Sequence, residues 1–199
     1  FSFGVVLCEM LHVLEAFPLG EYGWGSARAV PPEIEAMRHA YVDRNHLLGD
    51  PAFVKNPVEQ LLDRQYADRI RARIDLKRAG DSMRIKPGIE MREGTNTTHY
   101  SIADRFGNAI AVTYTLNDWF GARVTAAGTG VLLNNEMDDF TSKPGVPNLY
   151  GLVQGAVNKI EPGKRPLSSM TPTIVLRDGR PWMIVGTPGG SRIITAVML

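Results

Sequence analysis

The chain has 199 residues, of which 44% are hydrophobic and 22% charged, so it can build a packed core and is too apolar to be a disordered chain. Its 22 Lys and Arg nearly balance 21 Asp and Glu, which argues against a nucleic-acid or membrane-surface partner because both require a clear basic excess. The single cysteine, Cys8, excludes an internal disulfide and a metal centre built from several cysteines.

The first part of the chain is predicted to be helical. Apolar residues recur densely over residues 5–14, which predicts a buried helix that ends before Pro18. The Pro31-Pro32 pair suits a first helical turn and is predicted to open a second helix, which ends at Gly49. A third helix is expected over residues 57–76, where arginines interleaved with aspartates indicate a solvated face rather than a binding patch.

The second part is predicted to consist of strands and turns. Residues 77–96 show little periodicity, which is typical of an exposed linker. Two hairpins are then expected, with turns at residues 104–107 and 177–180. Between them lies a long irregular segment, and a glycine turn at residues 189–191 is expected to open a final helix. Helices followed by an antiparallel sheet are typical of the α+β class.

Common catalytic motifs are missing from the sequence. The four histidines lack the His-Glu-x-x-His spacing, and His39 and His46 have no acidic third ligand nearby, so a metal site is not favoured. There is no Gly-x-Ser-x-Gly motif and no Walker glycine loop. The glycine-rich stretch at residues 186–190 lacks the spacing of a dinucleotide-binding loop and alone indicates only a turn.

Five short motifs follow the predicted linker. Each alone is ordinary: a strand that begins with two threonines, a strand end, an acidic turn, a serine-rich loop and a glycine turn. They read Thr97-Thr98-His99-Tyr100-Ser101, Thr113-Tyr114-Thr115-Leu116-Asn117, Asn134-Asn135-Glu136-Met137-Asp138-Asp139-Phe140, Lys164-Arg165-Pro166-Leu167-Ser168-Ser169-Met170 and Gly189-Gly190-Ser191-Arg192. Together and in this order they resemble the gamma-glutamyltranspeptidase family of N-terminal nucleophile hydrolases.

The resemblance covers essentially the whole chain and implies how it is organised. Residues 1–96 resemble the end of the family's large subunit, mostly helical and ending in a linker, and residues 97–199 resemble the first part of its small, catalytic and β-rich subunit. The implied fold is part of the family's αββα sandwich. The sequence starts without Met and stops within an apolar pattern, so we expect a piece of a longer protein.

The resemblance also implies self-cleavage between Asn96 and Thr97. The Thr97 hydroxyl is expected to attack the Asn96 carbonyl carbon, and the resulting ester is expected to be hydrolysed. Cleavage frees the α-amino group of Thr97, whose pKa is ordinarily about 7.7 to 8.0. This amine can act as the base for its own hydroxyl, so the uncut precursor is expected to be inactive.

Three further residues are expected, by the same resemblance, to act at the reacting carbonyl group. Thr115 should hydrogen-bond the nucleophile hydroxyl. The backbone amides of Gly189 and Gly190 should form an oxyanion hole for the charge that develops on the carbonyl oxygen.

Residues 144–155, which include Tyr150, resemble the family's lid over the site, and such lids gate the access of water.

Five other residues are expected to hold the two charged groups on the α-carbon of a γ-glutamyl group. The resemblance gives the α-ammonium to Asn117, Glu136 and Asp139, whose oxygens suit a cation. It gives the α-carboxylate to the hydroxyls of Ser168 and Ser169. Some family members carry Gln in place of Glu136, whose carboxylate should strengthen ammonium binding. The family's carboxylate-binding arginine is expected to precede this chain, and no arginine within it matches that role by motif.

The implied activity is transfer and hydrolysis of γ-glutamyl groups through an ester on Thr97, with no metal or organic cofactor. Glutathione and other γ-glutamyl compounds are the implied substrates, and water, amino acids or short peptides are the implied acceptors. Large and small subunits should stay paired after cleavage. Export to the periplasm, the cell surface or the exterior is implied likewise.

Two alternatives stay open at this stage. A cephalosporin-acylase-like amidase of the same superfamily would use the same nucleophile on a different acyl group. An inactive remnant would serve as a scaffold. The complete set of ammonium- and carboxylate-binding residues favours the γ-glutamyl interpretation over the first alternative.

Overall fold

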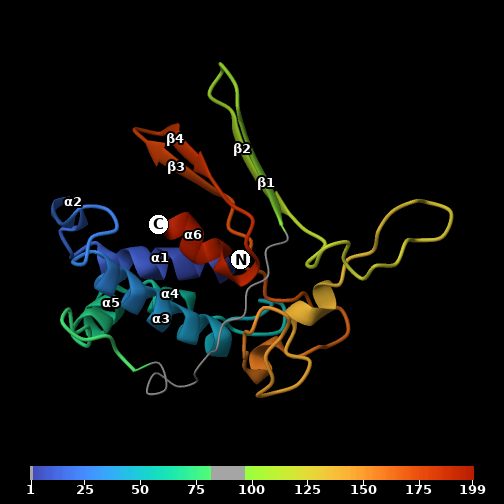
Figure 1. The fold of residues 1–199 in the computed structure, drawn as a ribbon, viewed down its shortest axis with the longest axis horizontal. Helices are drawn as coiled ribbons and strands as arrows, with labels where there is room; N and C mark the ends of the chain where they lie inside the picture. The colour runs from blue at the N-terminus through green and yellow to red at the C-terminus, as the bar shows by residue number, and fades with distance from the viewer. Residues whose placement is uncertain (1, 82–96) are drawn as a thin grey trace.

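A computed structural model of the chain describes residues 2–81 and 97–199. Helices fill its N-terminal half, two antiparallel hairpins follow, and the chain returns to a helix at its end (Figure 1). The α+β class predicted from the sequence is therefore confirmed. The linker residues 82–96, and with them the predicted cleavage residue Asn96, lie outside the described residues.

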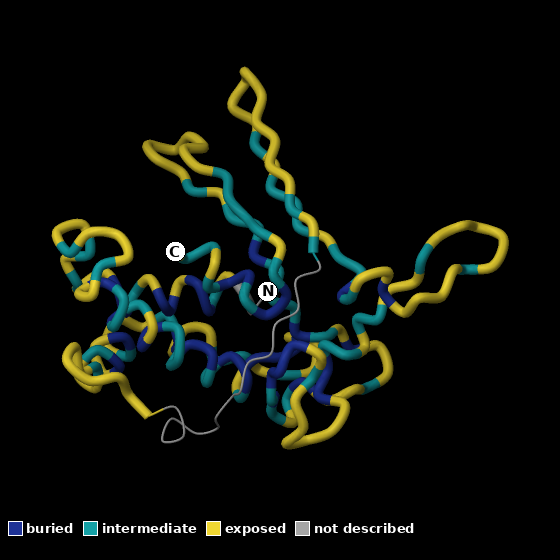
Figure 2. The backbone as a smooth tube through the Cα atoms, viewed as in Figure 1, coloured by how far each residue is buried: buried dark blue, intermediate teal, exposed yellow. Residues whose placement is uncertain are grey.

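The helical body is built on two long helices. α1 (Ser2–Leu14) packs on α3 (Val30–Leu47), and α5 (Arg64–Arg71) packs on α1. The terminal helix α6 (Ile193–Met198) packs on α1 as well, so residues from both ends of the sequence share one hydrophobic core. Figure 2 shows buried residues along these helices and in the irregular loops beside them. Residue 97 therefore does not separate two hydrophobic cores. That it marks the boundary between two subunits stays a prediction.

The second predicted helix agrees closely with the structure. α3 begins at Val30 and carries Pro31 and Pro32 in its first turn, where the missing amide hydrogens cost no helical hydrogen bond. It ends at Leu47, and Leu48 is already extended. Small residues such as Ala36 and Ala40 let α3 approach α1 closely, while the polar side chain of Arg44 on the same helix is also fully buried.

The third predicted helix is wrong in its extent. The structure divides it into α4 (Val58–Leu61) and α5, and α5 ends at Arg71 instead of residue 76. The break occurs at Asp63, whose side chain accepts a hydrogen bond from the Gln65 amide at 2.8 Å and so caps the start of α5. A short helix that the sequence did not predict, α2 (Leu19–Tyr22), lies between α1 and α3.

One of the arginines predicted to be solvated has a structural role. The Arg71 guanidinium donates hydrogen bonds to the carbonyl oxygens of His12, at 2.5 Å, and Val13, at 3.0 Å. These carbonyls belong to the last turn of α1, which has no further helical amides to satisfy them. Arg71 therefore joins α5 to the end of α1, while Arg69 and Arg73 remain exposed as predicted.

Both predicted hairpins are present. β1 (Thr98–Ala103) pairs with β2 (Ala109–Tyr114), and β3 (Thr173–Arg177) pairs with β4 (Arg180–Val185), each pair antiparallel. The Asp104 carboxylate closes the first turn by accepting from the amides of Phe106 and Asn108.

The hairpins differ from the expected single sheet. Within the described residues each forms its own two-stranded ladder, although β2 lies close to β3 and β4. Both project from the helical body (Figure 1). Short 3-10 turns, Glu136–Asp139 and Ala156–Asn158, punctuate the irregular segment between them. Among the described residues, no helix has the length and apolar character needed to cross a bilayer.

Candidate functional site

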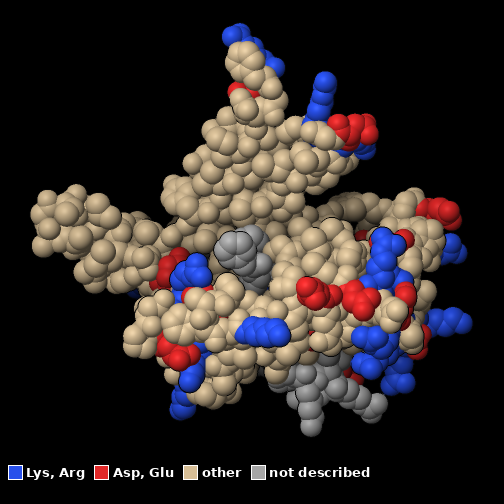
Figure 3. All heavy atoms as spheres, turned by 180° about the vertical axis from the view of Figure 1, so that it is seen from behind, with Lys and Arg blue, Asp and Glu red and all other residues tan. Residues whose placement is uncertain are grey.

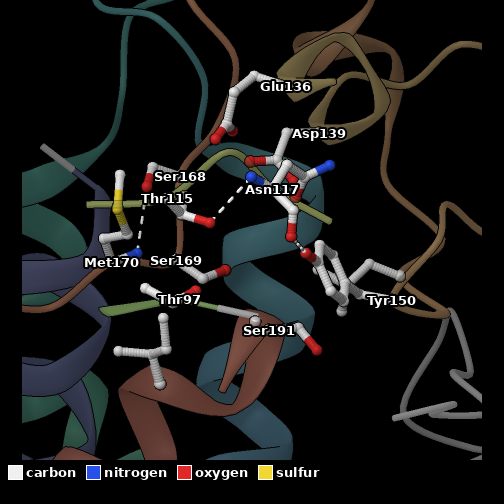
Figure 4. A pocket seen from close by; sticks show the side chains of 13 residues that line it. Thr97, Thr115, Asn117, Glu136, Asp139, Tyr150, Ser168, Ser169, Met170 and Ser191 are labelled. Atoms are coloured by element: carbon white, nitrogen blue, oxygen red, sulfur yellow. Dashed lines mark hydrogen bonds between the residues drawn. The ribbon is translucent and has the colours of Figure 1, made fainter. Parts of the chain in front are cut away.

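One pocket collects most of the residues singled out by the motifs (Figure 4). Its volume is about 20 Å³, room for about one water molecule. The predicted site residues that line it are Thr97, Thr115, Asn117, Glu136, Asp139, Tyr150, Ser168, Ser169 and Gly190. Gly189 precedes the lining residue Gly190 without lining the pocket itself.

The strand register explains why the two threonines meet. Thr98 is the first residue of β1 and pairs with Tyr114, the last residue of β2. Thr97 and Thr115 are the next residue along each strand, so both leave the hairpin at its base and reach the same pocket. The Thr115 Oγ1 atom accepts a hydrogen bond from the Asn117 amide at 2.9 Å, which fixes the turn after β2.

Asn117 is held in an uncommon backbone conformation. Its φ is 75°, in the left-handed region that asparagine tolerates better than most residues, and it is 2% exposed. Its side-chain amide donates to the Asn135 carbonyl at 3.2 Å, and its own carbonyl accepts from the Tyr150 hydroxyl. A strained backbone conformation that several hydrogen bonds hold in place is typical of functional positions.

Glu136 and Asp139 form the acidic wall of the pocket. They begin and end one 3-10 turn, in which residues three apart lie on the same side. Burial, together with the neighbouring Asp139 charge, raises the pKa of Glu136 to about 8. Burial also raises the pKa of Asp139 to about 6, against the opposing charge of Arg44. A cation bound here would relieve the repulsion and favour both ionised forms.

The serine pair, Ser168 and Ser169, lies in a loop that is hydrogen-bonded to α3 and is called the serine loop here. Ser168 Oγ accepts from the Met170 amide at 3.1 Å, and Ser169 Oγ accepts from the Arg44 guanidinium at 2.9 Å. Just before the pair, Arg165 donates to both oxygens of Asp50, which follows α3. The Arg165 guanidinium holds the pKa of the Asp50 carboxyl well below its usual range.

Sequence reasoning missed Arg44. No motif surrounds it, and within α3 it reads as one more charged residue. The available signal was weak: Arg44 lies at helical spacing from Ala36, Ala40 and Tyr41, and this spacing predicts a buried face. A buried guanidinium needs partners, and the serine loop supplies them.

The glycine turn requires its glycines. Gly189 has a φ of 146° and Gly190 a φ of 55°, and side chains disfavour both values. Tyr41 of α3 donates a hydrogen bond from its hydroxyl to the carbonyl of Ser191, the next residue. Upstream, Gly186 lies beneath the His99 ring, where an added Cβ would be 2.2 Å from the ring atoms. The turn is thus fixed against both α3 and β1.

The segment at residues 144–155 covers the acidic wall. Tyr150 is 4% exposed, and its hydroxyl donates to the carbonyl of the neighbouring Asn117. The Leu149 amide donates to Asp138 at 2.7 Å, and the Gln154 side chain donates to the Asp139 carbonyl at 3.0 Å. These contacts place the segment where a lid would lie, and its gating role stays a prediction.

The comparisons with known proteins agree with these motifs. The family model described as Gamma-glutamyltranspeptidase matches residues 1–199. A glutathione hydrolase proenzyme from Pseudomonas sp. is 66% identical, over 100% of this chain and 34% of that protein. The Escherichia coli glutathione hydrolase proenzyme is 52% identical, over 99% of this chain and 34% of that protein. This chain therefore spans about a third of the length of these curated relatives.

Acylases and solved structures also match. An acylase proenzyme, Acylase ACY 1, from Pseudomonas is 39% identical over 99% of this chain and 33% of that protein. A Helicobacter pylori gamma-glutamyltranspeptidase mutant aligns with a TM-score of 0.50 and 63% identity, over 51% of this chain and 54% of that one. A Bacillus halodurans cephalosporin acylase aligns with a TM-score of 0.71 over 98% of this chain and 32% of that one; at 23% identity it supports the fold alone.

Proposed function

Because the chain belongs to the gamma-glutamyltranspeptidase family, we propose that it carries the nucleophile and the glutamyl-binding side chains of a longer proenzyme. That proenzyme would transfer and hydrolyse γ-glutamyl groups. One observation carries the proposal: a single pocket brings together Thr97, the acidic pair, the serine pair and Gly190. Such a set offers a nucleophile, a cation site and anion donors within one small volume.

The first proposed step is self-cleavage. The Thr97 hydroxyl attacks the Asn96 carbonyl carbon, the peptide bond shifts to an ester, and water hydrolyses that ester. Thr97 then has a free α-amino group, with a pKa ordinarily near 7.7 to 8.0, which can accept the proton of its own hydroxyl. The names of the relatives, which are proenzymes, support this order of events.

Acyl transfer would follow the same chemistry. The Thr97 oxygen attacks the γ-carbonyl carbon of the substrate, and the charge that develops on the carbonyl oxygen is met by the amides of Gly189 and Gly190. The leaving amine takes the proton held by the Thr97 amino group. Water or an acceptor amine then attacks the γ-glutamyl ester and frees the threonine. None of these steps uses a metal or an organic cofactor.

Recognition would place the α-carbon of the glutamyl group, which carries both charged groups, away from the γ-carbonyl carbon that Thr97 attacks. In Figure 4 Glu136 and Asp139 lie on one side, and Thr97 lies on the other. The acids and Asn117 would bind the α-ammonium, and the hydroxyls of the serine pair would bind the α-carboxylate. Because the present volume suits about one water, substrate entry would require residues 144–155 to move.

Glutathione and related γ-glutamyl compounds would be donors, and amino acids or short peptides would be acceptors beside water. The subunits produced by cleavage would remain paired, because α6 and the serine loop are packed against α1 and α3. We further propose that the mature enzyme acts in the periplasm, at the cell surface or outside the cell.

The decisive experiment uses the longer proenzyme that contains these residues. Intact mass after incubation should show two chains, and release of aniline from a γ-glutamyl anilide should appear with them. Thr97→Ala should stay as one chain and lose turnover by at least ~10³-fold. Thr98→Ala, which changes the exposed neighbour of the same type, should be cleaved and active. An uncut active protein, or equal activity of Thr97→Ala, would overturn the proposal.

The acylase matches favour one second candidate, an amidase for other acyl groups. A glutaryl anilide has the same carbonyl as the γ-glutamyl anilide but lacks the α-ammonium. Preference for the γ-glutamyl compound supports the proposed function, whereas preference for the glutaryl compound supports the amidase.

A further inference from the structure

Two buried side chains of α3 hydrogen-bond to residues that line the pocket. Tyr41 and Arg44 are three positions apart, so they lie on one face of the helix. Arg44 is fully buried and Tyr41 is 7% exposed. The Arg44 guanidinium lies 6.0 Å from the centre of the Tyr41 ring, so the two side chains pack together. Neither belongs to any motif of the catalytic part.

Arg44 fixes the serine loop at several points. Its guanidinium donates to Ser169 Oγ at 2.9 Å, to the Leu167 carbonyl at 3.2 Å and to the Ser168 carbonyl at 3.4 Å. It also donates to Asn45 on its own helix at 3.0 Å. A guanidinium is a planar fork of donors, whereas a lysine ammonium is a single point that cannot match this spread of acceptors.

The direction of these hydrogen bonds determines what Ser169 can do. A guanidinium has no acceptor, so in this contact the Ser169 oxygen must accept. The hydroxyl proton of Ser169 is then left to be donated to another acceptor. A carboxylate in the pocket is such an acceptor, and the positive charge behind the serine favours it.

Tyr41 contacts the glycine turn, which forms another wall of the pocket. Its hydroxyl donates to the carbonyl of Ser191, immediately after Gly189 and Gly190. Burial raises the pKa of Tyr41 to about 12, so the phenol keeps its proton and remains a donor at neutral pH. The carbonyl of Ser191 is thereby tied to a rigid helix, and the orientation of the preceding glycine amides depends on this tie.

We propose that Tyr41 and Arg44 are positioning residues of this site, Tyr41 for stabilisation of the oxyanion and Arg44 for binding of the substrate. The inference rests on the proposed function. Arg44 orients Ser169 as a donor to the substrate α-carboxylate, and Tyr41 holds the glycine turn that receives the oxyanion. A helix on the large-subunit side of the predicted cleavage thus shapes two walls contributed by the small-subunit side.

The two roles predict different kinetic changes in the longer proenzyme. Arg44→Lys keeps the charge and removes the fork, so KM for a γ-glutamyl anilide should rise about tenfold with kcat little changed. Tyr41→Phe removes one oxygen and keeps the ring, so kcat should fall about tenfold with KM little changed. Turnover is expressed per enzyme molecule labelled by a covalent glutamate analogue, which removes the effect of misfolded or uncut protein.

Matched controls lie on the same helical body. Arg38→Lys changes another arginine of α3, which pairs with Glu35 away from the pocket. Tyr66→Phe removes the hydroxyl of a half-buried tyrosine, which donates to Asp43 at 2.5 Å. Both should retain wild-type KM and kcat per labelled enzyme.

A double-mutant cycle tests whether Arg44 acts through the serine. Ser169→Ala should raise KM, and adding Arg44→Lys to it should raise KM by less than twofold more. A substrate anilide without the α-carboxylate should show similar KM values with the wild type and Arg44→Lys.

The outcomes separate this inference from its premise. If Arg44→Lys and Tyr41→Phe leave both constants of the labelled enzyme unchanged, or change them in the same way, the positioning roles are wrong while the proposed function stands. If the Arg44→Lys and Ser169→Ala effects on KM multiply fully, the route through Ser169 is wrong. If the wild type itself lacks activity that depends on Thr97, the proposed function fails and the inference fails with it.

Discussion

Glu136 and Asp139 show how position changes the chemistry of a side chain. In the sequence they belong to an acidic turn, which is ordinarily ionised and solvated. In the structure they share one wall of a covered pocket, and burial raises the pKa of both carboxyl groups. At neutral pH the pair therefore retains a proton that a bound ammonium group would displace.

This displacement gives a prediction for substrate binding. Because the raised pKa of Glu136 is about 8, the fraction that is ionised and ready to bind a cation falls as the pH drops below 8. KM for a γ-glutamyl anilide should therefore rise as the pH is lowered from ~8 to ~6. Glu136→Gln should raise KM about tenfold at pH ~8 and flatten the profile, because a neutral amide has no proton to lose.

The measurement is the pH profile of KM for both proteins, with Glu59→Gln in exposed α4 as the control. An identical pH profile for the wild type and Glu136→Gln would contradict the assignment of Glu136 to the ammonium site.

At the scale of elements, the packing of α1 on α3 buries an acidic side chain that does not line the pocket. Glu9 of α1 is 1% exposed, and its carboxyl group lies beside that of the half-buried Asp43 of α3. Burial raises the pKa of Glu9 to about 9, and the charge of Asp43 on α3 contributes. The hydroxyl of Tyr66 on α5 donates to Asp43, so three helices meet at this point.

The contact predicts how stability depends on pH. The pKa of Glu9 is higher in the folded state than the value of about 4.3 expected in the unfolded chain, so the folded state binds the extra proton. Its contribution to stability is fully present below pH ~4 and declines as the pH rises through 9. Glu9→Gln should therefore be more stable than the wild type at pH ~8 by about 2 kcal/mol, and closer to it at pH ~5.

Denaturant unfolding of the processed enzyme at both pH values measures this difference, with Glu59→Gln as an exposed control. A Glu9→Gln protein that loses stability equally at both pH values would show that Glu9 is ionised in the core.

At the scale of the whole molecule, the two hairpins are poorly covered. Ile102 and Ile110 are cross-strand partners on β1 and β2, and both are about half exposed. In Figure 3 charged side chains gather over the helical body and at the hairpin tips, while the hairpins between are mostly uncharged. Open ladder edges with apolar faces associate unless other chain segments cover them.

The uncovered hairpins predict opposite effects of one change in two contexts. The 199-residue chain alone should bind an apolar dye and aggregate, and the double substitution Ile102→Thr and Ile110→Thr should reduce both. In the longer proenzyme the same substitution should lower the free energy of unfolding by about 2 kcal/mol, because it removes buried apolar surface. Light scattering and thermal unfolding measure the two effects. A sharp, cooperative melt of the unsubstituted 199-residue chain would contradict the prediction.

The sequence alone determined the order of elements and the identity of the motif residues. Helical periodicity, the Pro31-Pro32 start and the Asp104 turn are local signals, so α1, α3 and both hairpins follow from residues close together in the chain. The extent of the third helix was wrong because the Asp63 cap competes locally with a continuous helical pattern.

Only the tertiary structure decided which of these residues share a pocket and what surrounds them. Arg44 reaches Ser169 across 125 positions and Tyr41 reaches Ser191 across 150, and no local pattern encodes such pairings. The shifted pKa values of Glu136 and Glu9 depend in the same way on burial. Burial and long-range hydrogen bonds arise from packing between elements, so they exist only once α3, the serine loop and the glycine turn have come together.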